Sequence, residues 1–315
     1  MAAAEVTIDG LGRFGVHYNE SANDGEETNL ESRFRLNFSA TTQSDAGIEF
    51  GGKIRIEHND GDNADKVEVT HATNGDNVIS KTRTGAQTGA AQMHAKLGAA
   101  TVLVGNVGDA VDSMPGLYLP TSSVGTGLNY MDPGLVTIHD IGGFGDGPGV
   151  VNGVALKFGM GDLNLQVNAS DDHSDRVLSG YVSYKIGDWQ IALAGLDNSD
   201  ADQNIVVGTV TGDLGFASVG AAFGQNENVD SQNGVSSNID ADKFRLFGHI
   251  PVGMATELVV WGADEDKNGS KDGSSFGIDI EHHLGGGVTA VAGYSDSARN
   301  DDKGAQASAG VLFKF

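Results

Sequence analysis

The chain has 315 residues, with 19 Lys and Arg against 43 Asp and Glu, which gives a formal net charge of −24. This charge excludes an ordinary nucleic-acid-binding protein, which would present a basic face. The absence of cysteine excludes a disulfide framework, a thiolate nucleophile and a cysteine-ligated zinc site. No run of about 18 apolar residues is present, so a membrane-spanning helix is excluded. The mean hydropathy of −0.20 still allows a transmembrane β-barrel, whose strands alternate apolar and polar residues.

The first four residues, Met-Ala-Ala-Ala, precede the first strand pattern and carry neither the basic region nor the apolar run of a secretory signal. A cytosolic protein with an alanine-rich start is one interpretation. The rest of the sequence favours the other, in which residues 1–4 are the remnant of a signal-peptide cleavage site or were added to the chain. We then expect residues 5–315 to form a single domain.

Period-2 alternation, the signal of a β-strand, runs along almost the whole chain. The first strand shows it clearly, because Val6, Ile8, Phe14 and Val16 share one parity. The same pattern predicts sixteen strands in chain order, at residues 6–18, 30–38, 48–57, 86–97, 100–106, 152–158, 163–169, 176–186, 189–196, 205–211, 216–223, 243–250, 255–261, 275–282, 288–294 and 305–315.

The connections between these strands alternate between two kinds. Short turns rich in Gly, Asp or Pro lie at 42–46, 98–99, 159–162, 187–188, 212–215, 251–254 and 285–287. Long acidic loops lie at 19–27, 59–85, 107–151, 170–175, 197–204, 224–242, 262–274 and 295–304. This arrangement predicts one up-and-down barrel with both termini at the short-turn end, which is typical of outer-membrane barrels.

The width of such a barrel decides which face of each strand turns inward. Side chains cannot fill the lumen of a sixteen-stranded barrel, so its interior must be wet and its exterior apolar. Closure of the sheet also satisfies every backbone group in lipid. The sequence therefore predicts an all-β, sixteen-stranded antiparallel transmembrane barrel in a bacterial outer membrane.

One group of basic residues lies on the polar faces of the first three predicted strands, which are antiparallel neighbours. Its members are Arg13, Arg33, Arg35, Lys53 and Arg55. Like charges facing each other across strands destabilise a sheet unless water or a counter-charge is near. One interpretation is a wall of salt bridges with Glu31, Glu49 and Glu57; the other is a basic half-ring that lines a channel.

The longest connection, 107–151, could supply the counter-charges. Connections longer than about 12–15 residues are usually functional or disordered. This one carries no basic residue, and its acids include Asp109, Asp112 and Asp132. We expect it to fold into the lumen and to present acidic groups to the basic wall.

Catalytic motifs are missing from the sequence. There is no G-x-S-x-G sequence and no P-loop lysine motif. The succession Glu281, His282, His283 could indicate a metal site, but adjacent side chains in a strand point to opposite faces. A solvated barrel rim is the interpretation we favour for this segment, and the identity of any bound metal stays open.

Short motifs in chain order resemble the sixteen-stranded general porins of Gram-negative outer membranes, most closely those of purple photosynthetic bacteria. The motifs are Gly12-Arg13-Phe14-Gly15, Ser32-Arg33-Phe34-Arg35-Leu36-Asn37, Gly52-Lys53-Ile54-Arg55, Val104-Gly105-Asn106-Val107 followed by Asp109 and Asp112, and the terminal Gly310-Val311-Leu312-Phe313-Lys314-Phe315. The resemblance spans almost the whole chain.

The resemblance implies a homotrimer in contact with lipopolysaccharide and outer-membrane lipid, with a water-filled pore in each subunit. Small hydrophilic solutes and ions would cross it by passive diffusion, and the five basic residues would face Asp109, Asp112 and Asp132 across a constriction. The segment 117–130 holds no acid where the family's loop often has one, which weakens the match at Asp132. No cofactor is implied beyond Ca²⁺ bound by the acidic loops, as in some relatives.

Two other function classes stay open. A substrate-specific channel would need a row of inward aromatic residues, and Tyr181 and Phe247 alone are few for that purpose. An outer-membrane barrel enzyme would need a catalytic cluster at the rim, and the sequence shows none. We therefore expect a diffusion channel without enzymatic activity.

Overall fold

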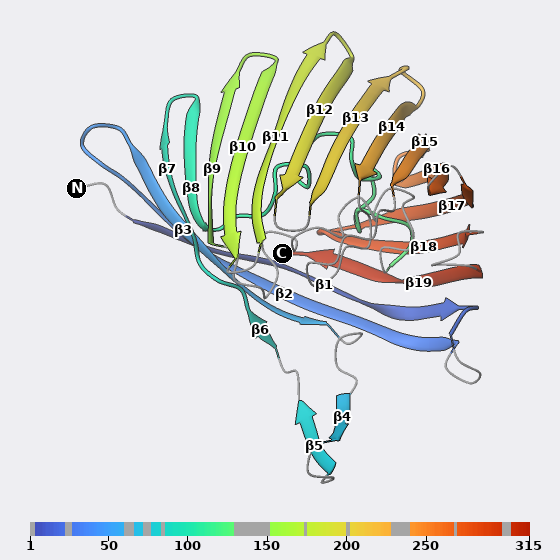
Figure 1. Ribbon diagram of the computed structural model, residues 1–315. Coiled ribbons are helices and arrows are strands. Elements are labelled where there is room, and N and C mark those ends of the chain that lie inside the picture. The colour runs from blue at the N-terminus through green and yellow to red at the C-terminus, as the bar shows by residue number, and fades with distance from the viewer. Residues whose placement is uncertain are drawn as a thin grey trace.

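The computed structural model describes residues 4–22, 27–59, 66–71, 77–82, 86–128, 152–172, 175–199, 202–227, 240–267, 270–297 and 304–315. These residues form a ring of long, neighbouring strands joined by hairpin connections (Figure 1). No helix in this part of the chain is long and apolar enough to cross a membrane.

The described strands are β1 (Glu5–Asn19), β2 (Thr28–Gln43), β3 (Glu49–Asn59), β4 (Lys66–His71), β5 (Asn77–Thr82), β6 (Gln87–Thr88), β7 (Gln92–Leu97), β8 (Ala100–Asn106), β9 (Asn152–Met160), β10 (Leu163–Asp172), β11 (Asp175–Ile186), β12 (Trp189–Asn198), β13 (Gln203–Asp213), β14 (Ser218–Glu227), β15 (Ala241–Val252), β16 (Thr256–Lys267), β17 (Ser270–Gly285), β18 (Val288–Ser297) and β19 (Gly304–Lys314). All strands except β4 and β5 follow one another around the ring in chain order.

Pairing of the first strand with the last closes the sheet. β1 is antiparallel to β2 on one side and to β19 on the other, from Leu11 opposite Lys314 to Asn19 opposite Gln306. β6 and β7 both pair with β3, so they form one interrupted strand, and the seventeen strands of this sheet occupy 17 − 1 = 16 positions. The predicted sixteen-stranded antiparallel barrel is confirmed.

The polarity of the wall is also as predicted. In β17 the alternate residues Asp279 and Glu281 are buried inside the barrel, whereas Ile278 and Ile280 are 38% and 44% exposed. β15 and β16 also turn apolar side chains outward, and their buried inner faces carry Lys243, Arg245 and Glu265 among apolar residues. An apolar outer face and a partly charged inner face suit a wet lumen surrounded by lipid.

Two local features of the strands were not predicted. The connection 59–85 contains β4 and β5, which pair only with each other in a second sheet. The predicted strand 86–97 is interrupted at residues 89–91, where Gly89 N donates to Arg55 O and Asn106 N donates to Ala91 O. The amide of Gly89 and the carbonyl of Ala91 therefore keep backbone hydrogen-bond partners on the neighbouring strands.

The described start of the long connection lies inside the barrel. Residues 107–128 follow β8 and run along the inner wall (Figure 1); we call them the inner loop. Trp261 of β16 supports this path, because its indole Nε1 donates to Thr126 Oγ1 at 2.6 Å. Opposite Trp261 in β17 stands Gly277, where a Cβ would collide with the indole, so glycine is required there. The predicted entry of the connection 107–151 into the lumen is confirmed for its described part, residues 107–128.

Candidate functional site

The inner loop is held at its start by polar side chains of β10, β11 and β13. Asn168 Nδ2 donates to Gly108 O, and Ser179 Oγ accepts a hydrogen bond from Ala110 N at 2.7 Å. Thr209 Oγ1 donates to Pro115 O at 2.6 Å. These bonds satisfy loop backbone groups that the barrel wall would otherwise bury without partners.

Arg245 of β15 binds the middle of the inner loop. Its side chain is 1% exposed, and its Nη2 donates to Gly116 O at 3.1 Å and to Leu117 O at 2.6 Å. Leu117 packs with Val111 and Met114 against small apolar residues of the inner wall. A buried guanidinium with carbonyl acceptors, next to an apolar cluster, holds this part of the loop in one position.

Carboxylates of β17 bind the last part of the inner loop. Glu281 accepts hydrogen bonds from Ser122 N and Ser122 Oγ, both at 2.6 Å, and is 2% exposed. Asp279 accepts one from Gly127 N at 2.6 Å. Leu128 N then donates to Ser308 Oγ of β19 at 2.7 Å. Glu281 is therefore a buried loop anchor, and our expectation of a solvated rim was wrong for this residue.

The predicted basic residues lie on neighbouring strands, as the alternation indicated. Arg13 stands opposite Arg33 in the β1–β2 register. The Arg13 side chain is 4% exposed, and its Nη2 lies 2.6 Å from Glu31 Oε1, which is 7% exposed. This ion pair is buried within the wall, so Arg13 is less accessible to solutes than its neighbours.

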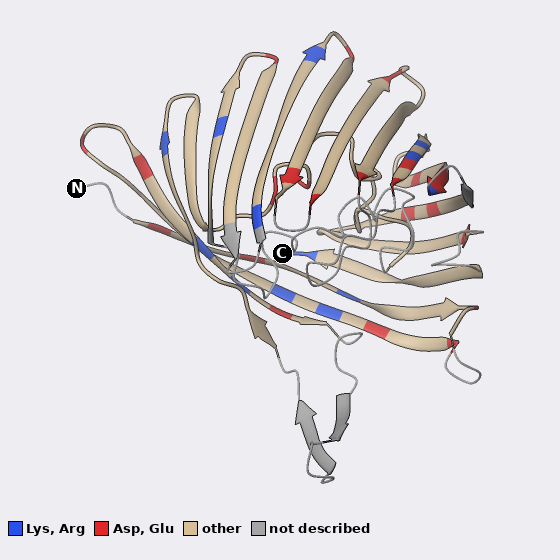
Figure 2. Cartoon of the chain, viewed as in Figure 1, with Lys and Arg blue, Asp and Glu red and all other residues tan. Residues whose placement is uncertain are grey.

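Arg33 and Arg35 are more open to the lumen, at 24% and 21% exposure, and both pair with Glu57 of β3. Arg55 Nε donates to Asn37 Oδ1 at 3.2 Å, and Lys53 is half-buried. Figure 2 shows blue bands followed by a red one along β2. Arg13, Arg33 and Arg35 thus form the salt bridges of the first interpretation, and the second, a basic half-ring that lines a channel, stays a prediction.

The acidic groups of the inner loop lie near its start. Asp112 N donates to Asp109 Oδ1 at 2.8 Å, and Tyr118 OH donates to Asp112 Oδ1. Burial raises the pKa of Asp109 to about 7, because desolvation outweighs the hydrogen bond from Asp112 N. Asp132 lies outside the described residues, so its predicted role stays untested.

Sequence reasoning gave no role to several charged residues of the inner wall, among them Lys157, Arg245 and Asp279. The alternation pattern could have identified each of them, because each lies at one of the alternate strand positions whose side chains point into the barrel. Lys157 of β9 lies close enough to Lys53 to interact with it electrostatically, so it extends the basic region beyond β3.

Comparison with known proteins gives a family. The family model described as Gram-negative porin matches residues 1–303. The chain is 28% identical to the porin of Fuscovulum blasticum over 326 residues, covering 99% of this chain and 100% of that one. It is 24% identical to the porin of Rhodobacter capsulatus over 337 residues, again covering 99% of this chain and 100% of that one.

Solved structures agree on the fold. A mutant of the Rh. blastica porin superimposes with a TM-score of 0.73 at 22% identity, covering 99% of this chain and 100% of that chain. A Rhodopseudomonas blastica porin triple mutant gives the same TM-score and coverage. The family and the names of its members point to a channel rather than an enzyme.

Proposed function

For this chain, which belongs to the Gram-negative porin family and is a general diffusion porin of the bacterial outer membrane, we propose a constriction. It is formed by two opposing groups of charges. The basic group consists of Arg13, Arg33, Arg35, Lys53 and Arg55. The acidic group consists of Asp109 and Asp112, with Asp132 as a further member.

The observation that carries this proposal is the path of the inner loop. Its side-chain hydrogen bonds to the described wall lie on β10, β11, β13, β15, β16, β17 and β19. The basic residues lie on β1, β2 and β3. Asp109 and Asp112 therefore start from the part of the ring near β10 and β11, away from the arginines, with the lumen between the two groups.

Opposed charges would select solutes by polarity. A solute in the constriction sheds part of its hydration and aligns its dipole with the transverse field, so apolar solutes are disfavoured. A pair of unit charges about 4 Å apart contributes about 1 kcal/mol in bulk water and about 4 kcal/mol near a protein surface. Each charge should therefore change ion selectivity without closing the channel.

Reversal potentials in planar bilayers under a salt gradient test the proposal. The double variant Arg33→Ala with Arg35→Ala should become more cation-selective and show a larger conductance. Asp109→Asn with Asp112→Asn should become more anion-selective. Both shifts should shrink in about 1 M salt, where the Debye length is about 3 Å.

A matched control is Lys185→Ala, because Lys185 is exposed beside the short turn that follows β11. Removal of this single charge should shift the reversal potential less than either double variant does. If neither double variant shifts it at low salt, these residues do not line the constriction.

For assembly we propose a homotrimer, which is typical of the family, in contact with lipopolysaccharide. Supporting this, β1 and β2 expose large apolar side chains on their outer faces, including Leu30 at 80% and Phe14 at 56%. Such a surface needs lipid or a second subunit to cover it. Cross-linking in detergent followed by denaturing electrophoresis should give a trimer band, and a monomer alone would contradict this assembly.

We also propose that divalent cations such as Ca²⁺ bind the acidic long loops and reduce repulsion from anionic lipopolysaccharide. Calcium takes carboxylate and carbonyl oxygens. Among the described residues, the one group of three candidate metal ligands contains a histidine, which does not suit calcium. Support therefore comes from loop composition, and an unchanged melting temperature of the assembly after addition of a chelator would contradict the proposal.

A further inference from the structure

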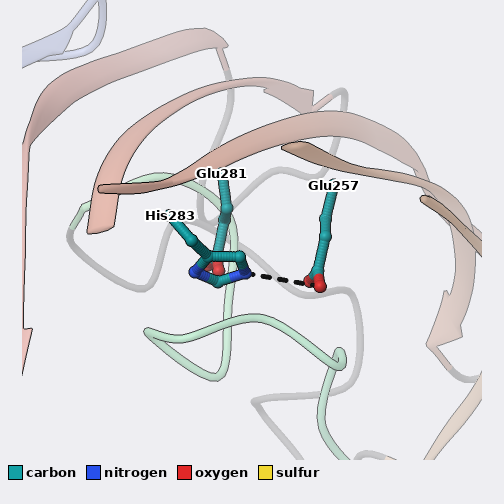
Figure 3. Close-up of side chains that lie close together, drawn as sticks. All are labelled: Glu257, Glu281 and His283. Carbon is teal, nitrogen blue, oxygen red and sulfur yellow. Dashed lines mark ion pairs between the residues drawn. The ribbon is translucent and has the colours of Figure 1, made fainter. Parts of the chain in front are cut away.

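A second group of charged residues lies on the inner wall, near the short-turn ends of β15, β16 and β17. It consists of His249, Glu257, Glu281 and His283, which we call the His-Glu cluster. Glu257 stands directly opposite Glu281 in the β16–β17 register, and His283 lies two residues further along on the same face. Figure 3 shows three of these side chains converging beside the pale green inner loop.

The imidazoles approach one carboxylate from both sides. His249 Nε2 lies 3.1 Å from Glu257 Oε2, and His283 Nε2 lies 3.3 Å from Glu257 Oε1. One ligand atom from each of Glu257, Glu281 and His283 falls within 4.8 Å of the others. Tetrahedral ligands about 2.0–2.2 Å from Zn²⁺ are about 3.3–3.6 Å apart, so small side-chain rotations would close the site.

Outer hydrogen bonds orient two of these groups. His283 Nδ1 is 3.1 Å from Thr289 Oγ1, which leaves Nε2 directed at Glu257. Ser122 holds both oxygens of Glu281 from the inner loop. Metal-ligating histidines and carboxylates commonly have such outer partners, which fix the ring orientation and leave one coordinating atom presented.

The electrostatics of the cluster call for a cation. Two carboxylates directly opposite each other on adjacent strands repel and destabilise the sheet. The partners recorded for Glu257 in the described part of the chain are the two histidines, with no Lys or Arg among them. A divalent ion between the two carboxylates would remove the repulsion.

From this geometry we propose that the His-Glu cluster binds one first-row divalent transition-metal ion, such as Zn²⁺. Glu257, Glu281 and His283 supply two carboxylates and one imidazole nitrogen, which match the ligand preference of Zn²⁺, and His249 beside Glu257 is the candidate fourth ligand. Calcium and magnesium prefer sites made of oxygen alone. The proposal is separate from the constriction, since none of the four residues belongs to it.

The ion would have access to this site and an effect on the pore. A cavity of about 250 Å³ lies beside His283, lined also by Ser122, Thr289 and Lys314, and His283 is 42% exposed. A bound ion would add two positive charges to the inner wall next to the Ser122 anchor. Saturation with Zn²⁺ should therefore shift the reversal potential toward anion selectivity.

Isothermal titration of the detergent-solubilised protein with ZnCl₂ tests the site directly. Wild type should bind one Zn²⁺ per subunit. Loss of an outer partner of a metal ligand costs about 10–100-fold in affinity, so His283→Ala and Glu257→Gln, which remove ligands, should each weaken binding by at least that much. The matched control is His282→Ala, because His282 is the adjacent residue on the opposite face of β17 and contacts Thr256 Oγ1 instead. This variant should bind Zn²⁺ as wild type does.

Two further measurements keep the proposal falsifiable. X-ray absorption of the zinc-loaded protein should show mixed nitrogen and oxygen ligands, and CaCl₂ should not displace the ion. If wild type binds no zinc, the proposal is overturned. It is also overturned if His282→Ala weakens binding as much as His283→Ala does.

Discussion

On β2 and β3 the charged side chains pair with one another at the edge of the lumen, whereas on β15 to β17 they are buried, and two of them, Arg245 and Glu281, bind the inner loop. Arg33 and Arg35 share Glu57 and keep more than a fifth of their surface exposed. Arg245 and Glu281 are almost completely buried and are bonded to the loop.

The difference shows two uses of charge in one barrel. Ion pairs in contact with water contribute little stability, but their field reaches a passing solute. Buried charges lose hydration, so each needs fixed partners, and those partners then hold the loop. We expect substitutions on β2 and β3 to change selectivity, and substitutions on β15 to β17 to change stability and loop position.

The largest expected effect is on the loop-bearing wall. Lys243 Nζ lies 3.2 Å from Glu265 Oε2, and the two side chains are 0% and 1% exposed. Glu265→Gln removes a buried counter-charge of this ammonium, which should lower the free energy of unfolding by about 3–5 kcal/mol. Thermal unfolding in detergent, followed by circular dichroism, measures this loss. An effect below about 1 kcal/mol would contradict the contrast between the two walls.

The next effect concerns the middle of the inner loop. Arg245→Leu removes the donor to Gly116 O and Leu117 O, and a hydrogen bond to a charged group is worth about 1.5–3 kcal/mol. We expect the loop to detach partly, with a larger and noisier single-channel conductance and faster proteolysis within residues 107–128. Lys185→Leu, which removes an exposed basic residue, should leave both readouts unchanged.

A smaller effect should appear with pH. With a pKa of about 7, Asp109 is mostly neutral one unit below that value and mostly charged one unit above it. Because its pKa is raised on folding, its contribution to stability is greatest at acid pH and is lost as pH rises through about 7. Cation selectivity should increase over the same range, as the carboxylate forms.

The control for this titration is Asp109→Asn. Other groups of the chain also respond to pH, so the wild-type curve alone does not isolate Asp109. The relevant measurement is therefore the difference in reversal potential between wild type and Asp109→Asn as a function of pH. A difference that does not change with pH would contradict the titration of Asp109.

The barrel could be predicted from the sequence because its signals are local. The alternation from Val6 to Val16 sets the face of each residue, and the alternating loop lengths set the direction of each strand. Interruption of the strand at residues 89–91 was not predictable from periodicity, since it depends on partners in β3 and β8.

The site was predictable only in part. Parity placed Arg33 and Arg35 on one face, but it does not say which charges are buried. Burial depends on where the inner loop lies. Ser122 and Gly116 fix its path through hydrogen bonds to Glu281 and Arg245, and nothing in the sequence around them identifies these partners. Glu257 and His249 likewise meet only through the three-dimensional arrangement of β15 and β16.

The smallest stability effect is expected on the basic wall, at Glu57. Glu57→Gln keeps the size of the side chain and removes the shared counter-charge of Arg33 and Arg35, which lie beside water. An exposed ion pair contributes about 0–1 kcal/mol, so the melting temperature should change far less than in Glu265→Gln. Freed of their counter-charge, the two arginines should attract anions more strongly, and the reversal potential at low salt should shift accordingly. A large loss of stability without a change in selectivity would mean that the charges of β2 and β3 stabilise the fold, like those of β15 to β17, and do not act on passing ions.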